Sequence, residues 1–195
     1  RGCAATIGNF DGVHLGHQSV LGQLAERAEE LQVPVTVVMF EPQPREYFAP
    51  ETAPPRLTRF REKIEALRRF GVDRIVCLQF DRRLAGMAPE TFVRQILLDG
   101  LDVKYLVVGD DFRFGRERAG TFAMLEQAGD EYGFPVVNMH TFGIEGSRVS
   151  STRIREALAA GDLAAAEALL GRQFRMSGRV AHGDKRGRPI GFPTA

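Results

Sequence analysis

The 195-residue chain contains no tryptophan and only two cysteines, Cys3 and Cys77. Two cysteines are too few for a disulfide framework, which favours a reducing cytoplasm, and we expect both thiols to lie in buried strands. No apolar run approaches the roughly 20 residues that a membrane helix needs, so no membrane partner is expected. Neither sign of charge dominates, because 26 Lys and Arg residues face 25 Asp and Glu residues. This balance provides no broad basic field and counts against a sequence-independent nucleic-acid binder.

The chain does contain a regular alternation of short apolar runs and longer helical patterns. The apolar runs are rich in Val and Ile and predict strands at residues 4–7, 35–40, 74–80, 105–108 and 136–140. Apolar residues at helical spacing predict helices within residues 20–31, 64–70, 92–97 and 122–128. This succession is typical of an α/β fold with a Rossmann-like, doubly wound parallel sheet. In such sheets ligands bind beyond the carboxyl ends of the strands.

The pattern changes after Gly146. Residues 150–159 and 162–170 predict two short helices, with Asp162 as the N-cap of the second. A strand-like pattern begins at Phe174. We expect a domain boundary near Gly171, with residues 1–171 as the main domain. The remaining residues, 172–195, are too few for an independent fold.

The first candidate site is the segment Gly-Asn-Phe-Asp-Gly-Val-His-Leu-Gly-His at residues 8–17, directly after the first predicted strand. Its glycines allow a tight turn and a close approach of the backbone to a ligand. The helix that follows offers free N–H groups and the positive end of its dipole to an anion. His14 and His17 lie three residues apart on one face of its first turn, so the segment indicates phosphate chemistry.

Other interpretations of this segment stay open. The strand is followed by neither a G-x-x-x-x-G-K-[ST] loop nor a G-x-G-x-x-G turn, which speaks against a P-loop ATPase and a nicotinamide dehydrogenase. Two histidines at this spacing are also able to bind a metal, although a third ligand is hard to find. Alternatively both histidines are structural, because a histidine at a helix start helps to satisfy backbone groups.

A second candidate site lies at the start of a later predicted helix, where hydroxyl side chains stand in a row between arginines. Hydroxyl donors beside guanidinium forks suit a polyphosphate tail. Helix capping alone is a sufficient reason for one of the hydroxyls. The residues concerned are Arg148, Ser150, Ser151, Thr152 and Arg155.

A third stretch, residues 109–115, follows a predicted strand and combines acidic with aromatic side chains. Asp111, Phe112 and Phe114 indicate hydroxyl or metal-ion contacts beside a flat ring. The alternative is an ordinary Asp/Gly turn with two core phenylalanines.

A fourth stretch, residues 40–48, ends the second predicted strand. Pro42 and Pro44 stiffen an apolar loop that is suited to form one wall of a pocket for a flat ligand. The alternative is a lid that makes no contact with a ligand.

Taken together, these motifs resemble the nucleotidyltransferase superfamily, which transfers a nucleotidyl group from a nucleoside triphosphate and releases pyrophosphate. That resemblance rests on H-x-G-H at residues 14–17 and S-S-T-x-x-R at residues 150–155. More narrowly, the chain resembles the bacterial bifunctional riboflavin kinase/FAD synthetase family. The narrower motifs are G-N-F-D-G-V-H at 8–14, F-E-P-x-P at 40–44, R-L-T at 56–58, M-x-P-E-x-F-V at 87–93 and G-x-D-F-R-F-G at 109–115.

The resemblance implies that FMN and ATP, with Mg²⁺, give FAD and pyrophosphate. It implies catalytic roles for His14, His17 and Arg155, and contact with Mg²⁺ or nucleotide for Asp111. The flavin would lie against Pro42, Pro44, Phe112 and Phe114. The residues implied to contact ATP and its phosphates are Gly8, Asn9, Phe10, Gly16, Asp111, Arg148, Ser151, Thr152 and Arg155.

Residues 178–195 resemble the opening of the same family's β-barrel kinase module. By that resemblance Gly183, Lys185 and Thr194 would bind nucleotide and Mg²⁺ for phosphorylation of riboflavin. Because the rest of the barrel is absent from the sequence, kinase activity is expected only in a longer protein.

Two other functions remain compatible with the residues. One is adenylyl or cytidylyl transfer to another small phosphate, such as nicotinamide mononucleotide or phosphopantetheine. The other is a non-catalytic flavin- or nucleotide-binding module, although binding alone does not require both phosphate motifs.

Overall fold

A parallel five-stranded sheet forms the centre of the molecule. The computed structural model describes residues 2–109, 111–139, 143–144 and 147–178. The strands are β1 (Cys3–Ile7), β2 (Val35–Glu41), β3 (Arg74–Gln79), β4 (Val103–Gly109) and β5 (Val136–Met139), in the order β3-β2-β1-β4-β5. All four neighbouring pairs run parallel. The chain first winds outward from β1 to β3 and then crosses to β4, so the predicted doubly wound sheet is confirmed. The reversal lies between β1 and β4, where such sheets place their ligands.

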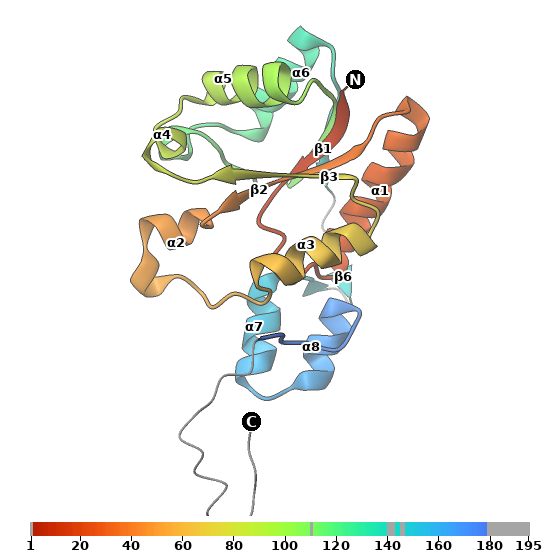
Figure 1. Ribbon diagram of the computed structural model, residues 1–195, viewed down its shortest axis with the longest axis vertical. Helices are drawn as coiled ribbons and strands as arrows, with labels where there is room; N and C mark the ends of the chain where they lie inside the picture. Colours follow the sequence, from red (N-terminus) through yellow and green to blue (C-terminus); the bar gives the residue numbers. More distant parts are fainter. Residues whose placement is uncertain (1, 110, 140–142, 145–146, 179–195) are drawn as a thin grey trace, which may run out of the picture.

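Helices cover both faces of the sheet (Figure 1). One face carries α1 (Leu15–Leu31) and α3 (Phe60–Arg69). The other carries α4 (Arg82–Ala85), α5 (Pro89–Phe92), which continues into a π-helical segment, η2 (Val93–Gly100), and α6 (Phe122–Tyr132). Three short helical turns lie in loops: α2 (Pro44–Phe48), η1 (Pro50–Thr52) and η3 (Arg116–Arg118). No helix in the described ranges is long and apolar enough to cross a membrane.

The core has two layers because successive side chains of a strand point to opposite faces of the sheet. In β1, Ala5 and Ile7 pack with the apolar residues of η2 and α6, whereas Ala4 packs with those of α1 and α3. In β4, Val108 and Val107 divide between the two layers in the same way. Strands buried on both faces explain why the sequence shows continuous apolar runs rather than alternation.

Two helices follow the sheet, α7 (Ser151–Ala159) and α8 (Leu163–Leu170), and they lie together at one end of the molecule (Figure 1). Asp162 is the N-cap of α8, as predicted, and its side chain accepts a hydrogen bond from the amide of Ala165. A short hairpin, β6 (Gly143–Ile144) and β7 (Ser147–Arg148), precedes α7. The two helices share a small core that includes Leu57, so they are packed onto the loop region below the sheet.

Two expectations from the sequence are wrong. Cys3 is buried, but Cys77 is exposed, because β3 is an edge strand and only part of its surface is covered. The strand-like pattern that begins at Phe174 forms no strand over residues 174–178, where the description of this part of the chain ends. The predicted strand end at His140 and the kinase residues Gly183, Lys185 and Thr194 lie outside the described residues. The domain boundary at Gly171 stays a prediction.

Candidate functional site

The segment between β1 and α1, residues 8–14, forms a loop with an unusual backbone; we refer to it as the β1–α1 loop. Phe10, Gly12 and Val13 have φ angles of 47°, 84° and 42°, all in the left-handed region. A β-branched residue such as Val13 rarely adopts this region, and the strain costs on the order of 1–2 kcal/mol. Gly8 and Asn9 open the loop at the carboxyl end of β1, where Asn9 is exposed. Contacts from other elements must hold this conformation.

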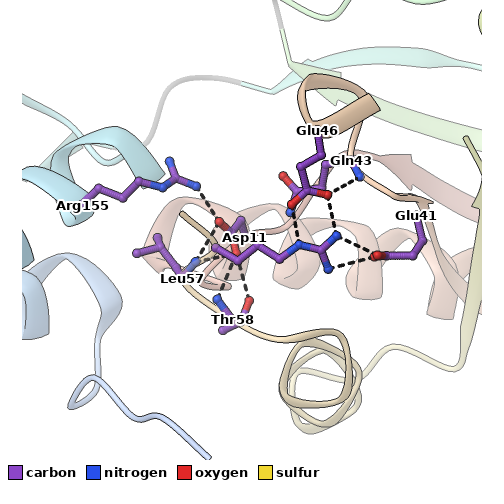
Figure 2. A network of polar contacts seen from close by, with 8 residues as sticks. Asp11, Glu41, Gln43, Glu46, Leu57, Thr58 and Arg155 are labelled. Atoms are coloured by element: carbon purple, nitrogen blue, oxygen red, sulfur yellow. Dashed lines mark hydrogen bonds and ion pairs between the residues drawn. The ribbon is translucent and has the colours of Figure 1, made fainter. Parts of the chain in front are cut away.

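The carboxylate of Asp11 is the centre of those contacts, and it is only 3% exposed (Figure 2). It accepts hydrogen bonds from the backbone amides of Leu57 and Thr58 at 3.0 Å each and from the Thr58 hydroxyl at 3.1 Å. The Thr58 hydroxyl also accepts a hydrogen bond from the amide of Gly12. Asp11 therefore ties the β1–α1 loop to the segment before α3.

The second predicted motif meets the first at Asp11. The Ser151 hydroxyl, at the start of α7, donates to the backbone carbonyl of Asp11 at 2.9 Å. The Arg155 guanidinium donates to the Asp11 carboxylate at 2.5 Å (Figure 2). It also donates to the Pro55 carbonyl at 2.7 Å. Thr152 is exposed on the same turn. The fold thus brings the two motifs together, and it engages the predicted catalytic residue Arg155 with a carboxylate of the loop itself.

The two histidines of the loop and of the first turn of α1 lie face to face. Their ring centroids are 3.7 Å apart, and the rings are nearly parallel. His14 is the N-cap of α1, and its Nδ1 accepts a hydrogen bond from the amide of His17 at 3.3 Å. Gly16 lies beside the His14 ring, where a Cβ atom would come within 3.2 Å of Nδ1 and Cε1. A side chain at this position would press on the ring, so glycine fits the turn.

Both imidazoles are held in the neutral form. Burial lowers the pKa of His14 to about 4, although the nearby carboxylate of Asp11 opposes the shift. Burial also lowers the pKa of His17 well below its ordinary value, and the neighbouring His14 and Lys63 lower it further. Since Nδ1 of His14 accepts a hydrogen bond, its proton resides on Nε2. The pair therefore offers neutral N–H donors at pH 7 rather than cations.

Lys63, on α3, is a buried charge that the sequence did not mark as part of a site. It is 1% exposed, and burial lowers the pKa of its ammonium group while the carboxylates of Asp11, Glu41 and Glu46 raise it. It also acts electrostatically on His17. In a sequence, a buried lysine on an amphipathic helix looks the same as a solvent-exposed lysine. Only the packing of α3 against the loop makes it notable.

Residues 56–58 connect the β1–α1 loop to α2. The Arg56 guanidinium donates to the carboxylate of Glu41, at the end of β2, at 2.7 and 3.1 Å, and to that of Glu46, on α2, at 2.5 Å (Figure 2). Hydrogen bonding to Arg56 lowers the pKa of Glu46 and raises that of the guanidinium. The next two residues hold Asp11 through their amides. One short segment therefore fixes α2 relative to the loop.

An apolar cavity of about 340 Å³ opens at the carboxyl ends of β2, β3 and β4. Phe112 and Phe114, which the sequence placed beside a flat ring, both line it, and so does Pro44, the first residue of α2. Phe114 is also 6% exposed and packs into the core, as the alternative interpretation of that stretch expects, while its contact with a flat ring stays a prediction. Three arginines lie at the cavity wall: Arg45, Arg113 and Arg118. The other aromatic lining residues are Phe40, Phe48, Phe80 and Phe92.

The remaining predicted site residues lie at the margins. Pro42 is exposed, follows a cis peptide bond and is absent from the cavity lining. Asp111 is 3.8 Å from Arg148, and both side chains are at least half exposed. This contact brings the third stretch to the second motif. Within the described residues, no three His, Cys, Asp or Glu side chains gather as a metal site.

Sequence reasoning missed several residues that shape the site. Thr58 and Arg56 belong to a recognised motif, but no role was assigned to them. Gln18 and Arg172 make contacts to backbone carbonyls of the loop, which are not visible in a sequence because they depend on tertiary packing.

Comparison with known proteins matches the chain to two protein families. The FAD synthetase family matches residues 1–153, and the riboflavin kinase family matches residues 170–195. Proteins named bifunctional riboflavin kinase/FMN adenylyltransferase from Escherichia coli K12 and Pseudomonas fluorescens are 54% and 56% identical to the whole chain. The chain spans 62% of the length of each of these relatives.

A solved structure from Streptococcus pneumoniae, titled a macrolide-efflux protein, is 26% identical, with a TM-score of 0.76. The match covers 89% of this chain and 66% of that one, so the two proteins share a fold. The family match extends over most of the chain and includes the β1–α1 loop, the cavity and the first residues of α7. The chain therefore belongs to the FAD synthetase family.

Proposed function

We propose that this chain transfers the adenylyl group of ATP to FMN, forming FAD and releasing pyrophosphate. The observation that carries the proposal is the stacked pair of neutral histidines where the strained β1–α1 loop meets α1. This pair shares the carboxyl edge of the sheet with an aromatic cavity. The relatives named FMN adenylyltransferase support the same activity.

The cavity suits the isoalloxazine ring of FMN. Ligand pockets are typically about 300–1,000 Å³ and mostly apolar. This one is about 340 Å³, with seven aromatic and proline side chains in its wall. A flat ring stacks well on such surfaces. The arginines at the wall are suited to the phosphate of FMN, because guanidinium groups pair with phosphate oxygens in a bidentate manner. Arg56 fixes α2, and thereby one wall, against the β1–α1 loop.

The chemistry requires positioning more than acid–base catalysis. The second pKa of a phosphomonoester is about 6, so the FMN phosphate is mostly ionised at neutral pH and attacks the α-phosphorus without a general base. The bond from phosphorus to the FMN oxygen forms as the bond to the pyrophosphate oxygen breaks. Negative charge on the α-phosphoryl oxygens is then stabilised by preorganised donors.

Nε2–H of His14 and the ring N–H of His17 are the donors we assign to those oxygens. Neutral imidazoles suit this task because their stacking at 3.7 Å would be unfavourable if both were charged. The amides at the start of α1 add the favourable end of the helix dipole. Pyrophosphate would leave towards Arg148 and Thr152, whose side chains are exposed beside the start of α7.

Mg²⁺ fits this site as an ion that arrives with ATP. Mg²⁺ is typically held by substrate phosphates and one or two carboxylates. The oxygens of Asp11 are occupied by donors from Leu57, Thr58 and Arg155, whereas the carboxylate of Asp111 is exposed and available. When bound, the ion would supply neutralising charge on the phosphate oxygens.

The proposal is tested by incubating the chain with FMN, ATP and Mg²⁺ and separating the flavins by chromatography. We expect FAD and pyrophosphate in equal amounts. Parallel reactions with nicotinamide mononucleotide or phosphopantetheine as acceptor, and with CTP as donor, are expected to be much slower. Faster turnover of another acceptor would assign a different transferase, and binding without turnover would assign a non-catalytic module. Phosphorylation of riboflavin is proposed only for proteins of the relatives' length.

A further inference from the structure

Two side chains from outside the β1–α1 loop hold its backbone carbonyls. The guanidinium of Arg172 donates to the carbonyl of Gly12 at 2.7 Å. The side-chain amide of Gln18, in the first turns of α1, donates to the carbonyl of Val13 at 2.8 Å and to that of Leu170 at 2.9 Å. Both protons of the Gln18 NH₂ group are therefore used, and the consecutive carbonyls of Gly12 and Val13 are fixed.

The end of α8 provides the support for these contacts. Leu170 is the last residue of α8. Its carbonyl is one of the last four of the helix, which have no hydrogen-bond partner within the helix. Gly171 follows in the left-handed conformation, and a Cβ atom there would lie 2.6 Å from Cδ2 of Leu15, the first residue of α1. Residues 170–172 are thus pressed against the start of α1. These residues also open the segment that matches the riboflavin kinase family.

The fixed carbonyls determine where His14 lies. The carbonyl of Val13 belongs to the peptide group that leads into His14, so its direction sets the start of the histidine's backbone. Val13 is held at a φ of 42°, from which a β-branched residue relaxes readily unless other contacts oppose it. Releasing either carbonyl allows the loop to relax and the His14 ring to move away from His17.

We propose that Gln18 and Arg172 are positioning residues, which hold the β1–α1 loop so that His14 and His17 face the transferred phosphoryl group. The inference rests on the proposed adenylyl transfer. Neither residue touches the reacting atoms; each acts through the loop backbone. A misplacement of about 1 Å can lower a rate by about 100-fold. Loss of either contact therefore lowers kcat more than it changes the KM for ATP.

The test compares Gln18→Met and Arg172→Met in the full 195-residue chain with two matched controls. Gln23→Met changes an exposed glutamine on the same helix, and Arg175→Met changes an exposed arginine three residues further along the same segment. Arg172→Lys keeps a cation and a donor and serves as the conservative variant. For each protein we would measure kcat, the KM for ATP and, by far-UV circular dichroism, the folded fraction.

We expect kcat per folded molecule to fall by about 10- to 100-fold in Gln18→Met and Arg172→Met, with the KM for ATP changed by less than about threefold. Arg172→Lys should recover part of the loss, and the controls should match the unmodified chain. A fall in activity that only follows the folded fraction would show a merely structural role and overturn the inference. So would unchanged kcat in both variants.

A second readout does not depend on activity. NMR titration of the His14 ring should give a pKa of about 4 in the unmodified chain. The two variants should give a value closer to 6.5, because the released ring becomes hydrated. If the unmodified chain forms no FAD, the proposed function fails and this titration alone decides the inference. An unchanged His14 pKa in both variants would overturn it.

Discussion

Replacing the buried carboxylate of Asp11 by an amide should destabilise the protein strongly. In the unmodified chain the guanidinium of Arg155 lies 2.5 Å from the Asp11 carboxylate. In Asp11→Asn it loses this charged partner, and the new amide nitrogen cannot accept hydrogen bonds. The amides of Leu57 and Thr58 would compete for one remaining oxygen. Breaking a buried ion pair from one side typically costs about 3–5 kcal/mol, so we expect the free energy of unfolding to fall by about 4 kcal/mol.

Urea denaturation followed by far-UV circular dichroism measures this loss, because the chain lacks tryptophan for fluorescence. Asp102→Asn is the control: its exposed carboxylate pairs with Lys104, and its loss should change stability by less than about 0.5 kcal/mol. The double variant Asp11→Asn/Arg155→Met removes both charges and should be more stable than Asp11→Asn by about 1–2 kcal/mol. Equal losses in Asp11→Asn and Asp102→Asn would refute the reasoning.

Three further predictions concern the proposed reaction and the two histidines. His17→Ala should lower kcat by about 100-fold and change the KM for ATP much less, because the His17 N–H acts as a donor in the transition state. An unchanged kcat in steady-state kinetics would contradict this role. Phe48→Ala should raise the KM for FMN about fivefold and leave the KM for ATP unchanged, because Phe48 lines the cavity and is 66% exposed. The control is Phe60→Ala, which changes an exposed phenylalanine outside the cavity lining. Between about pH 4 and 6.5 the unfolded chain binds a proton at His14 that the folded chain does not, so this group should raise the free energy of unfolding by about 3 kcal/mol over that range and add nothing above pH 6.5. An acid titration in which stability falls as the pH rises from 4 to 6.5 would contradict the sign.

Much of the fold follows from patterns that are local in sequence. The strands are short apolar runs because both faces of the sheet are covered, and the helices between them keep apolar residues on one side. The contact between the two predicted phosphate motifs is harder to predict from the sequence. It depends on Ser151 and Arg155 reaching Asp11, across more than 100 residues of sequence.

The parts that the sequence did not predict arise from tertiary packing. The left-handed conformation of Val13 contradicts the preference of a β-branched residue, so only the surrounding hydrogen bonds explain it. Lys63 is buried because α3 lies against the loop and nearby carboxylates compensate its charge. Cys77 is exposed because β3 is an edge strand, and strand order is not visible in an apolar run.

The most direct test of adenylyl transfer follows the phosphates of ATP. The chain is incubated with FMN, Mg²⁺ and ATP that carries distinguishable labels on its α- and γ-phosphates. Adenylyl transfer predicts that the α label appears in FAD and the γ label in pyrophosphate, at equal rates. A γ label on the flavin, or an α label that remains in ATP, ADP or AMP while no FAD forms, would contradict it.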